Sequence, residues 1–134
     1  MPKLKKDHQE LLAIYEAIEK SFFDGSIEQT VIGLERFRTL IQSHLLLENV
    51  SLYVYLRRSR PNKKEQSIVT GYQKEMDGIG KAVLDFVGKY QELGRPGKHG
   101  LMISFPNDLA TVGQILEERI KREEMQLYPL YLPL

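Results

Sequence analysis

Residues 41–56 read IQSHLLLENVSLYVYL and combine an apolar helical pattern with two ionisable residues. Its apolar residues recur every three or four positions, which is the spacing of one face of a helix. His44 and Glu48 lie on that same face, four residues apart, where apolar side chains are expected. A buried charge without a partner is very costly, so this histidine and this glutamate need partners inside the fold.

The same spacing continues on both sides of this stretch and predicts four helices. They are expected at about residues 4–22, 27–59 and 63–93, and from about residue 106 to the C-terminal prolines. Long helices with short connections favour an antiparallel bundle. The sequence therefore predicts an all-α fold, an up-down-up-down four-helix bundle that forms one domain over residues 1–134.

Turn-forming residues separate the predicted helices. Asp24-Gly25-Ser26 is expected to end the first helix, with Ser26 capping the second, and Pro61 is expected to end the second. The glycine-rich residues 94–100 predict a loop in which His99 is exposed. Residues 101–105 are expected to pack back onto the bundle before the last helix begins at Pro106.

Composition limits the possible functions. The chain has 134 residues, of which 42% are hydrophobic, and it has no cysteine, which excludes a disulfide framework and a thiolate metal site. We expect no signal peptide and no membrane span. The net charge is +1, which does not indicate direct nucleic-acid binding. These features fit a cytoplasmic protein.

Ionisable residues occupy the apolar faces of three predicted helices. They are His8, His44, Glu48, Arg119 and Glu123. Metal sites in bundles are built from such inward-facing side chains, and histidine with glutamate suits iron, manganese or zinc. Either these residues hold a metal ion, or they neutralise one another.

Arg119 favours the second alternative, since a guanidinium keeps its proton and cannot be a metal ligand. It can form a bidentate pair with a carboxylate, and we expect it to neutralise Glu48 and Glu123. The sequence therefore predicts no bound cofactor, with iron or another divalent metal as the alternative. No nucleophile has a neighbouring base, so we expect no enzyme.

Several motifs resemble hemerythrin-like (HHE) domains. They are Asp7-His8, residues 44–53 (HLLLENVSLY) and residues 123–129 (EEMQLYP). That family consists of four-helix bundles with a non-haem di-iron centre, and the resemblance implies, as one alternative, an iron-binding sensor of oxygen, nitric oxide or redox state. The resemblance implies metal ligands at His8, His44, Glu48 and Glu123. Met76 or Tyr72 lies near the place of the family's third-helix histidine, and Arg119 stands at the fourth-helix histidine.

Residues 109–124 (LATVGQILEERIKREE) are similar to the regulator-of-sigma-D/AlgQ family, in which Arg119 fits the pattern. Those helical bundles bind the primary sigma factor of bacterial RNA polymerase. This resemblance implies a non-enzymatic regulator of transcription, of the anti-sigma type.

Two patches are candidates for contact with a protein partner. Their residues are Arg57, Arg58 and Arg60 before the second turn, and Tyr128 and Tyr131 near the C-terminus. The alternatives are a solvated turn for the arginines and packing onto the core for the C-terminal residues.

Overall fold

The structure, a computed structural model, describes residues 2–59 and 62–130, and these residues contain helices and no strand. The α-helices are α1 (Pro2–Phe23), α2 (Ile27–Leu47), α3 (Val54–Ser59), α4 (Lys63–Lys89) and α5 (His99–Arg122). Between α2 and α3 the backbone forms the π-helical segment η1 (Glu48–Tyr53), and after α5 it forms η3 (Glu123–Leu127). Short 3-10 segments, η2 (Tyr90–Glu92) and η4 (Tyr128–Leu130), follow α4 and η3. The prediction of an all-α fold is confirmed.

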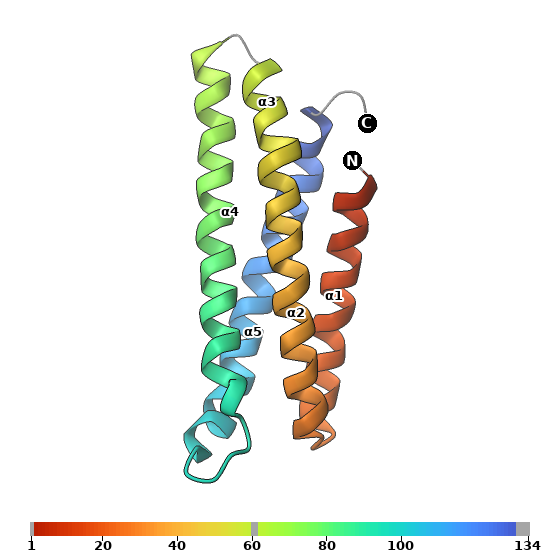
Figure 1. The fold of residues 1–134 in the computed structure, drawn as a ribbon, viewed down its shortest axis with the longest axis vertical. Helices are drawn as coiled ribbons and strands as arrows, with labels where there is room; N and C mark the ends of the chain where they lie inside the picture. Colours follow the sequence, from red (N-terminus) through yellow and green to blue (C-terminus); the bar gives the residue numbers. More distant parts are fainter. Residues whose placement is uncertain (1, 60–61, 131–134) are drawn as a thin grey trace.

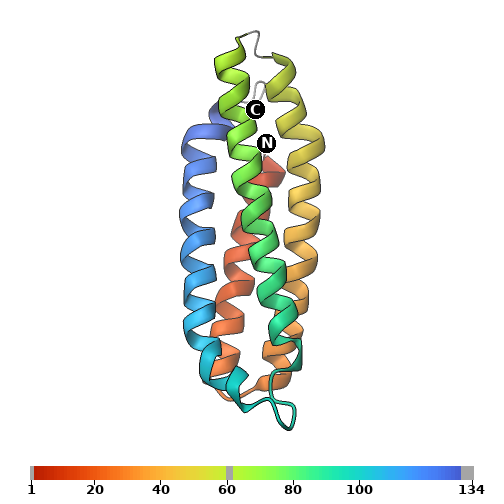
Figure 2. The same ribbon diagram turned by 90° about the vertical axis from the view of Figure 1, so that its left-hand side faces the viewer.

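Four helical rods lie side by side along the long axis of the molecule, because α2, η1 and α3 run on as one rod (Figure 1). The first and last described residues lie near the same end, and the connection between α4 and α5 lies at the other end. In the view of Figure 2, α4 stands in front of α1, with α5 and α2 on either side. Each of α1 and α4 therefore packs against both α2 and α5.

The first three predicted rods match the structure closely. Gly25 has φ of 82°, a left-handed conformation that ends α1 and that glycine adopts without strain. Ser26 stands at the N-cap of α2 as predicted, but its side chain makes no capping hydrogen bond. Its carbonyl oxygen instead accepts from the Thr30 hydroxyl at 2.8 Å.

The last helix begins earlier than predicted, at His99 and not near Pro106. Pro106 lies inside α5, where a proline loses one backbone hydrogen bond and costs roughly 3 kcal/mol. Phe105 and Leu109, on either side of this proline, are both buried in the core, and their burial offsets that cost. His99 is exposed, as predicted, at the first residue of α5.

The buried apolar side chains form two separate clusters. The smaller cluster lies toward the chain ends and comprises Leu4, Leu52, Tyr53, Leu56, Val69, Leu127 and Tyr128. The larger cluster fills the rest of the bundle and includes Leu11, Ile41, Met76, Phe105 and Ile120. On α1, His8 lies between Leu4 of the smaller cluster and Leu11 of the larger. A layer of polar side chains thus separates the two clusters.

No helix in the part of the chain that the structure describes is both long and apolar enough to cross a membrane.

Candidate metal centre

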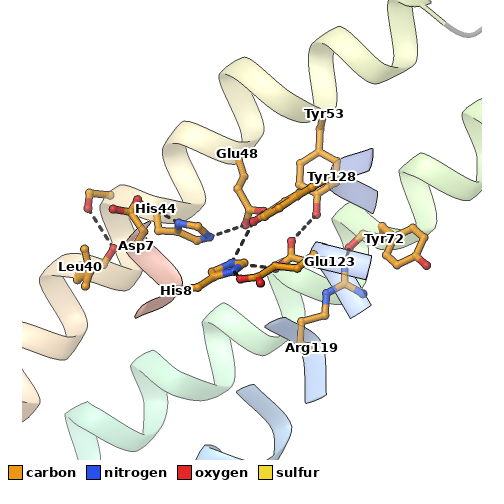
Figure 3. A network of polar contacts seen from close by, with 12 residues as sticks. Asp7, His8, Leu40, His44, Glu48, Tyr53, Tyr72, Arg119, Glu123 and Tyr128 are labelled. Atoms are coloured by element: carbon orange, nitrogen blue, oxygen red, sulfur yellow. Dashed lines mark hydrogen bonds and ion pairs between the residues drawn. The ribbon is translucent and has the colours of Figure 1, made fainter. Parts of the chain in front are cut away.

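The five ionisable residues predicted on apolar faces are all buried, each exposing 2% or less of its surface. His8 comes from α1, His44 from α2, and Glu48 from the start of η1. Arg119 comes from the last turn of α5, and Glu123 begins η3. The helices bring four of them together, whereas Arg119 extends away from the others (Figure 3).

Each histidine is oriented by a carboxylate on its Nδ1 atom. His8 Nδ1 lies 2.7 Å from Glu124 Oε2, and His44 Nδ1 lies 3.1 Å from Asp7 Oδ2. In the tautomer whose Nδ1 nitrogen donates to this carboxylate, the neutral ring keeps its lone pair on Nε2. Metal-binding histidines almost always have such an outer partner, which fixes the ring and its tautomer.

The Nε2 atoms of both histidines face the two glutamates. Ligand atoms of His8, His44 and Glu123 all lie within 4.8 Å of one another. His44 Nε2 is 3.2 Å from Glu48 Oε1, and His8 Nε2 is 3.5 Å from Glu123 Oε1. Two nitrogens and two carboxylates therefore converge from three rods of the bundle.

Several atoms at this point have no hydrogen-bond partner among the described residues. They are His44 Nε2, Glu48 Oε1 and Glu123 Oε1, and all are buried. A buried polar atom left unpaired costs about 1–3 kcal/mol. All three can offer lone pairs to a cation, and nitrogen with carboxylate oxygen is a donor set for iron, manganese or zinc. The residues present therefore fit a divalent metal ion.

The pKa values of the site reflect the same crowding. Burial, with the charge and hydrogen bond of Glu48, raises the pKa of Glu123 to about 7. Burial alone would raise the pKa of Glu48 and lower that of His44. The contact between them, together with hydrogen bonds and charges from Asp7, Glu123 and Tyr128, outweighs burial, so the pKa of Glu48 is lowered and that of His44 is raised. Without a cation, one of the two glutamates thus keeps its proton near neutral pH.

Arg119 does not have the partners predicted for it. It donates from Nη1 to Glu75 Oε2 at 3.0 Å and from Nη2 to the Tyr72 carbonyl oxygen at 2.8 Å. Its guanidinium also lies 4.7 Å from the centre of the Tyr72 ring. The long side chain reaches past the glutamates to α4, where the half-exposed Glu75 carboxylate remains hydrated. The predicted pairing with Glu48 and Glu123 is corrected to a pairing with Glu75.

The two residues considered for the place of the missing third-helix histidine differ in their surroundings. Met76 is buried in the larger apolar cluster. The centre of the Tyr72 ring lies 4.7 Å from the Arg119 guanidinium and 5.5 Å from that of Arg122, and the Tyr72 hydroxyl donates to Gln126.

Each glutamate of the site stands at the start of a π-helical segment. Glu48 is the first residue of η1, and Glu123 is the first residue of η3. π-helical turns inside α-helices are rare and occur frequently at functional sites. In this protein, η1 and η3 lie on the two rods that supply the glutamates. Both segments therefore adjoin the site, to which three rods contribute.

Two tyrosines complete the polar layer, and periodicity alone does not reveal them. The Tyr53 hydroxyl donates to Glu123 Oε2 at 3.3 Å. The Tyr128 hydroxyl donates to Glu48 Oε2 at 2.9 Å and lies 3.0 Å from His8 Nε2. Tyr128 exposes 1% of its surface, so its prediction as a partner-contact residue is wrong, and the alternative of packing onto the core holds.

The other candidate contact residues differ in their surroundings. Arg58 is exposed, whereas Arg57 is half-buried and donates to Gln73. Arg60 and Tyr131 lie outside the described residues. Arg58 therefore remains as the exposed member of the predicted patches.

In comparisons with protein-family models, with curated proteins and with solved structures, nothing matches the chain significantly. The two family resemblances therefore stay predictions from the sequence.

Proposed function

We propose that this protein is an up-down-up-down bundle of the hemerythrin-like type that binds one divalent metal ion, with iron as the first candidate. His8, His44, Glu48 and Glu123 would hold the ion. One observation carries the proposal. Both histidines turn Nε2 toward the glutamates while a carboxylate holds Nδ1, which is the arrangement of metal-binding histidines.

The alternative, a bundle neutralised from within, has lost its main support. It needs the Arg119 guanidinium on the two glutamates, and that guanidinium contacts Glu75. His44 Nε2 lies 3.2 Å from Glu48 Oε1 without forming a hydrogen bond, and Glu123 Oε1 also has no hydrogen-bond partner among the described residues. A divalent cation would satisfy both oxygens at once.

Bound iron would supply a redox-active ion able to bind oxygen or nitric oxide, which suits a non-enzymatic sensor. The chain's own residues orient the ligands and exclude water. Asp7 and Glu124 orient the histidines, and the two apolar clusters shield the site from water. The buried glutamates supply negative charge that draws a cation into the bundle.

Metal analysis tests this function. The chain, purified from iron-supplemented cells and then desalted, should hold about one equivalent of iron, because a built site fills when metal is supplied. His44→Ala should reduce the content to below about a tenth of an equivalent. His99→Ala is the matched control, because His99 is exposed and far from the site, and it should leave the content unchanged. Wild-type protein without bound iron, manganese or zinc would contradict the proposal.

A second candidate function is that of a bacterial regulator that binds a protein partner, with the primary sigma factor as the first to test. One observation favours it. Arg58 lines a surface groove with Val50 and Val54, and Val50 is 61% exposed. An apolar surface beside a cation suits a partner that presents apolar and acidic residues.

Binding to purified primary sigma factor at micromolar concentration tests this candidate. The double variant Val50→Asp with Arg58→Glu should weaken binding at least tenfold, because it reverses the charge of the groove and removes an exposed apolar side chain. Arg95→Glu, in the connection between α4 and α5, repeats the charge reversal of Arg58→Glu away from the groove and should bind normally. Absence of binding by the wild-type chain would exclude this partner.

A further inference from the structure

Tyr128 occupies a place that a hydrogen-bonding role does not explain well. It begins η4, directly after the π-helical segment that carries Glu123. Its ring stacks on the His8 ring, with an interplanar angle of 17°. Its buried hydroxyl points into the polar layer, between Glu48 and His8 (Figure 3).

The number of protons at this hydroxyl does not match the number of acceptors. Glu48 Oε2 lies 2.9 Å away and His8 Nε2 lies 3.0 Å away. A neutral His8 with its proton on Nδ1, held by Glu124, offers only a lone pair at Nε2. A phenol has a single proton, so it can satisfy only one of these two acceptors. The lone pairs of the Tyr128 oxygen, Glu48 Oε2 and His8 Nε2 then face one another. A bound cation would remove this repulsion, because it can accept all three.

The distances between these atoms also match those between neighbouring ligands of one metal ion. Ligand atoms at about 2.1 Å from an octahedrally coordinated ion lie about 3 Å from their nearest neighbours. The Tyr128 oxygen is 2.9 Å from Glu48 Oε2 and 3.0 Å from His8 Nε2. The contact between His44 Nε2 and Glu48 Oε1 measures 3.2 Å, and that between His8 Nε2 and Glu123 Oε1 measures 3.5 Å. The hydroxyl thus continues the series of candidate ligand atoms at the spacing of neighbouring ligands.

Tyr53 shows what a tyrosine with only a supporting role looks like in the same layer. Its hydroxyl donates to Glu123 Oε2 at 3.3 Å, and its other polar neighbour is the Arg119 guanidinium, which is a donor and not a metal ligand. It has one proton for one acceptor. The two buried tyrosines therefore differ in the number of candidate ligands that each hydroxyl contacts.

We propose that Tyr128 is itself a metal ligand, binding the ion through its phenolate oxygen as the fifth protein ligand. The inference rests on the proposed metal-binding function. When the ion binds, the O–H bond of Tyr128 breaks, an oxygen–metal bond forms, and the proton is released to solvent. No oxidant or reductant takes part, because the metal keeps its oxidation state.

Iron(III) makes this ligand visible. A phenolate bound to iron(III) gives a charge-transfer band in visible light and phenolate vibrations in resonance Raman spectra, whereas histidine and carboxylate ligands give neither. The metal-free chain is loaded with iron(III) nitrilotriacetate and desalted, and its iron content is measured alongside both spectra. Tyr128→Phe and the matched control Tyr53→Phe are treated in the same way.

We expect the wild-type chain and Tyr53→Phe to show the band and the phenolate vibrations. Tyr128→Phe should bind iron about 10–100-fold more weakly and, when loaded, should show neither signal. Wild-type protein that binds iron without a phenolate signal would overturn the inference and leave the proposed function standing. So would a signal that survives in Tyr128→Phe or that disappears only in Tyr53→Phe. A wild-type chain that binds no iron(III) would overturn this inference, and one that also holds no iron, manganese or zinc in the metal analysis would overturn the proposed function as well. If Tyr128→Phe does not fold, the wild-type and Tyr53→Phe Raman spectra still decide the question.

Discussion

Glu48 and Glu123 bring two fully buried carboxylates together, and this arrangement disfavours the ionisation of both. The pKa of Glu123 is raised to about 7 by burial and by the neighbouring Glu48. Between its usual pKa of 4.5 and about 7, the folded chain holds a proton that the unfolded chain releases. The stability of the metal-free protein should therefore fall as the pH rises through this window.

Glu123→Gln tests this loss of stability. The glutamine amide resembles the protonated carboxyl group in shape and does not ionise. The variant therefore does not lose stability as the pH rises. We expect the metal-free variant to exceed the wild type by roughly 3 kcal/mol at about pH 8, and the two to be similar near pH 4.5. Urea unfolding with a chelator present measures the difference. The exposed carboxylate of Glu118, changed to Gln as a control, should alter stability by less than about 0.5 kcal/mol at both pH values. An equal gain at both pH values would contradict the argument.

Arg119 and Arg122 share the carboxylate of Glu75 but differ in burial. Arg119 exposes 1% of its side chain and Arg122 exposes 48%. Arg119→Ala should cost about 1–3 kcal/mol, because it leaves a buried gap and removes a charged hydrogen bond to the Tyr72 carbonyl oxygen. Arg122→Ala should cost less than about 0.5 kcal/mol, since exposed ion pairs contribute little. Urea unfolding compares the two variants, and equal losses would contradict the difference in environment.

Side-chain identity and spacing explain how far the site could be predicted. His8, His44, Glu48 and Glu123 were found because each interrupts an apolar face, and all four are buried as expected. The partner of Arg119 was not predicted correctly, because helical period fixes which face a residue occupies but not how far a long side chain reaches. Asp7 and Glu124 adjoin His8 and Glu123 in the sequence. Adjacent residues on a helix point about 100° apart, so the sequence did not reveal which histidine each one orients.

At the scale of elements, helix packing depends on a glycine that periodicity does not single out. A Cβ atom added to Gly113 on α5 would lie 2.3 Å from the Tyr15 hydroxyl oxygen on α1. That hydroxyl donates to the Leu109 carbonyl oxygen at 3.0 Å, so Tyr15 bridges the two helices. Gly78 on α4, by contrast, has nothing within 4 Å of its added Cβ.

Matched alanine substitutions separate the two kinds of helical glycine. Gly113→Ala should destabilise the fold by about 1–3 kcal/mol, because Tyr15 must move and lose its contact with α5. Gly78→Ala should stabilise the fold by up to about 1 kcal/mol, since alanine has the higher helix propensity and the site is open. Thermal or urea unfolding measures both, and changes of the same sign would contradict the packing argument.

The element boundaries show where sequence reasoning ends. The long rods follow from apolar spacing over many residues, so their extents were predicted to within a few positions. The start of α5 was missed because proline often stands in the first turn of a helix, whereas here the helix begins at His99 and buries Phe105 directly before Pro106. The π-helical turns η1 and η3 were also missed. They insert one extra residue into a turn, which a three-and-four pattern cannot distinguish from an α-helix.

At the scale of the whole molecule, the polar layer divides the bundle into unequal parts. The larger cluster packs residues of α1, α2, α4 and α5 at the end where α1 turns into α2. The smaller cluster, at the end with the termini, buries few apolar side chains of its own. Between them lie unpaired buried atoms, so in the metal-free protein the smaller end should open first.

Amide hydrogen exchange with and without bound iron tests this asymmetry. In the metal-free chain, we expect the amides of Leu52 and Leu127 to exchange much faster than those of Leu34 and Leu109. An ion held by α1, α2, η1 and η3 ties the smaller end together, and at 100 times its dissociation constant it adds about 2.7 kcal/mol. Exchange at Leu52 and Leu127 should then slow by about 100-fold. His44→Ala, as the control, should keep its fast exchange when iron is added. Equal exchange at both ends of the metal-free wild type would mean that the polar layer does not weaken the bundle.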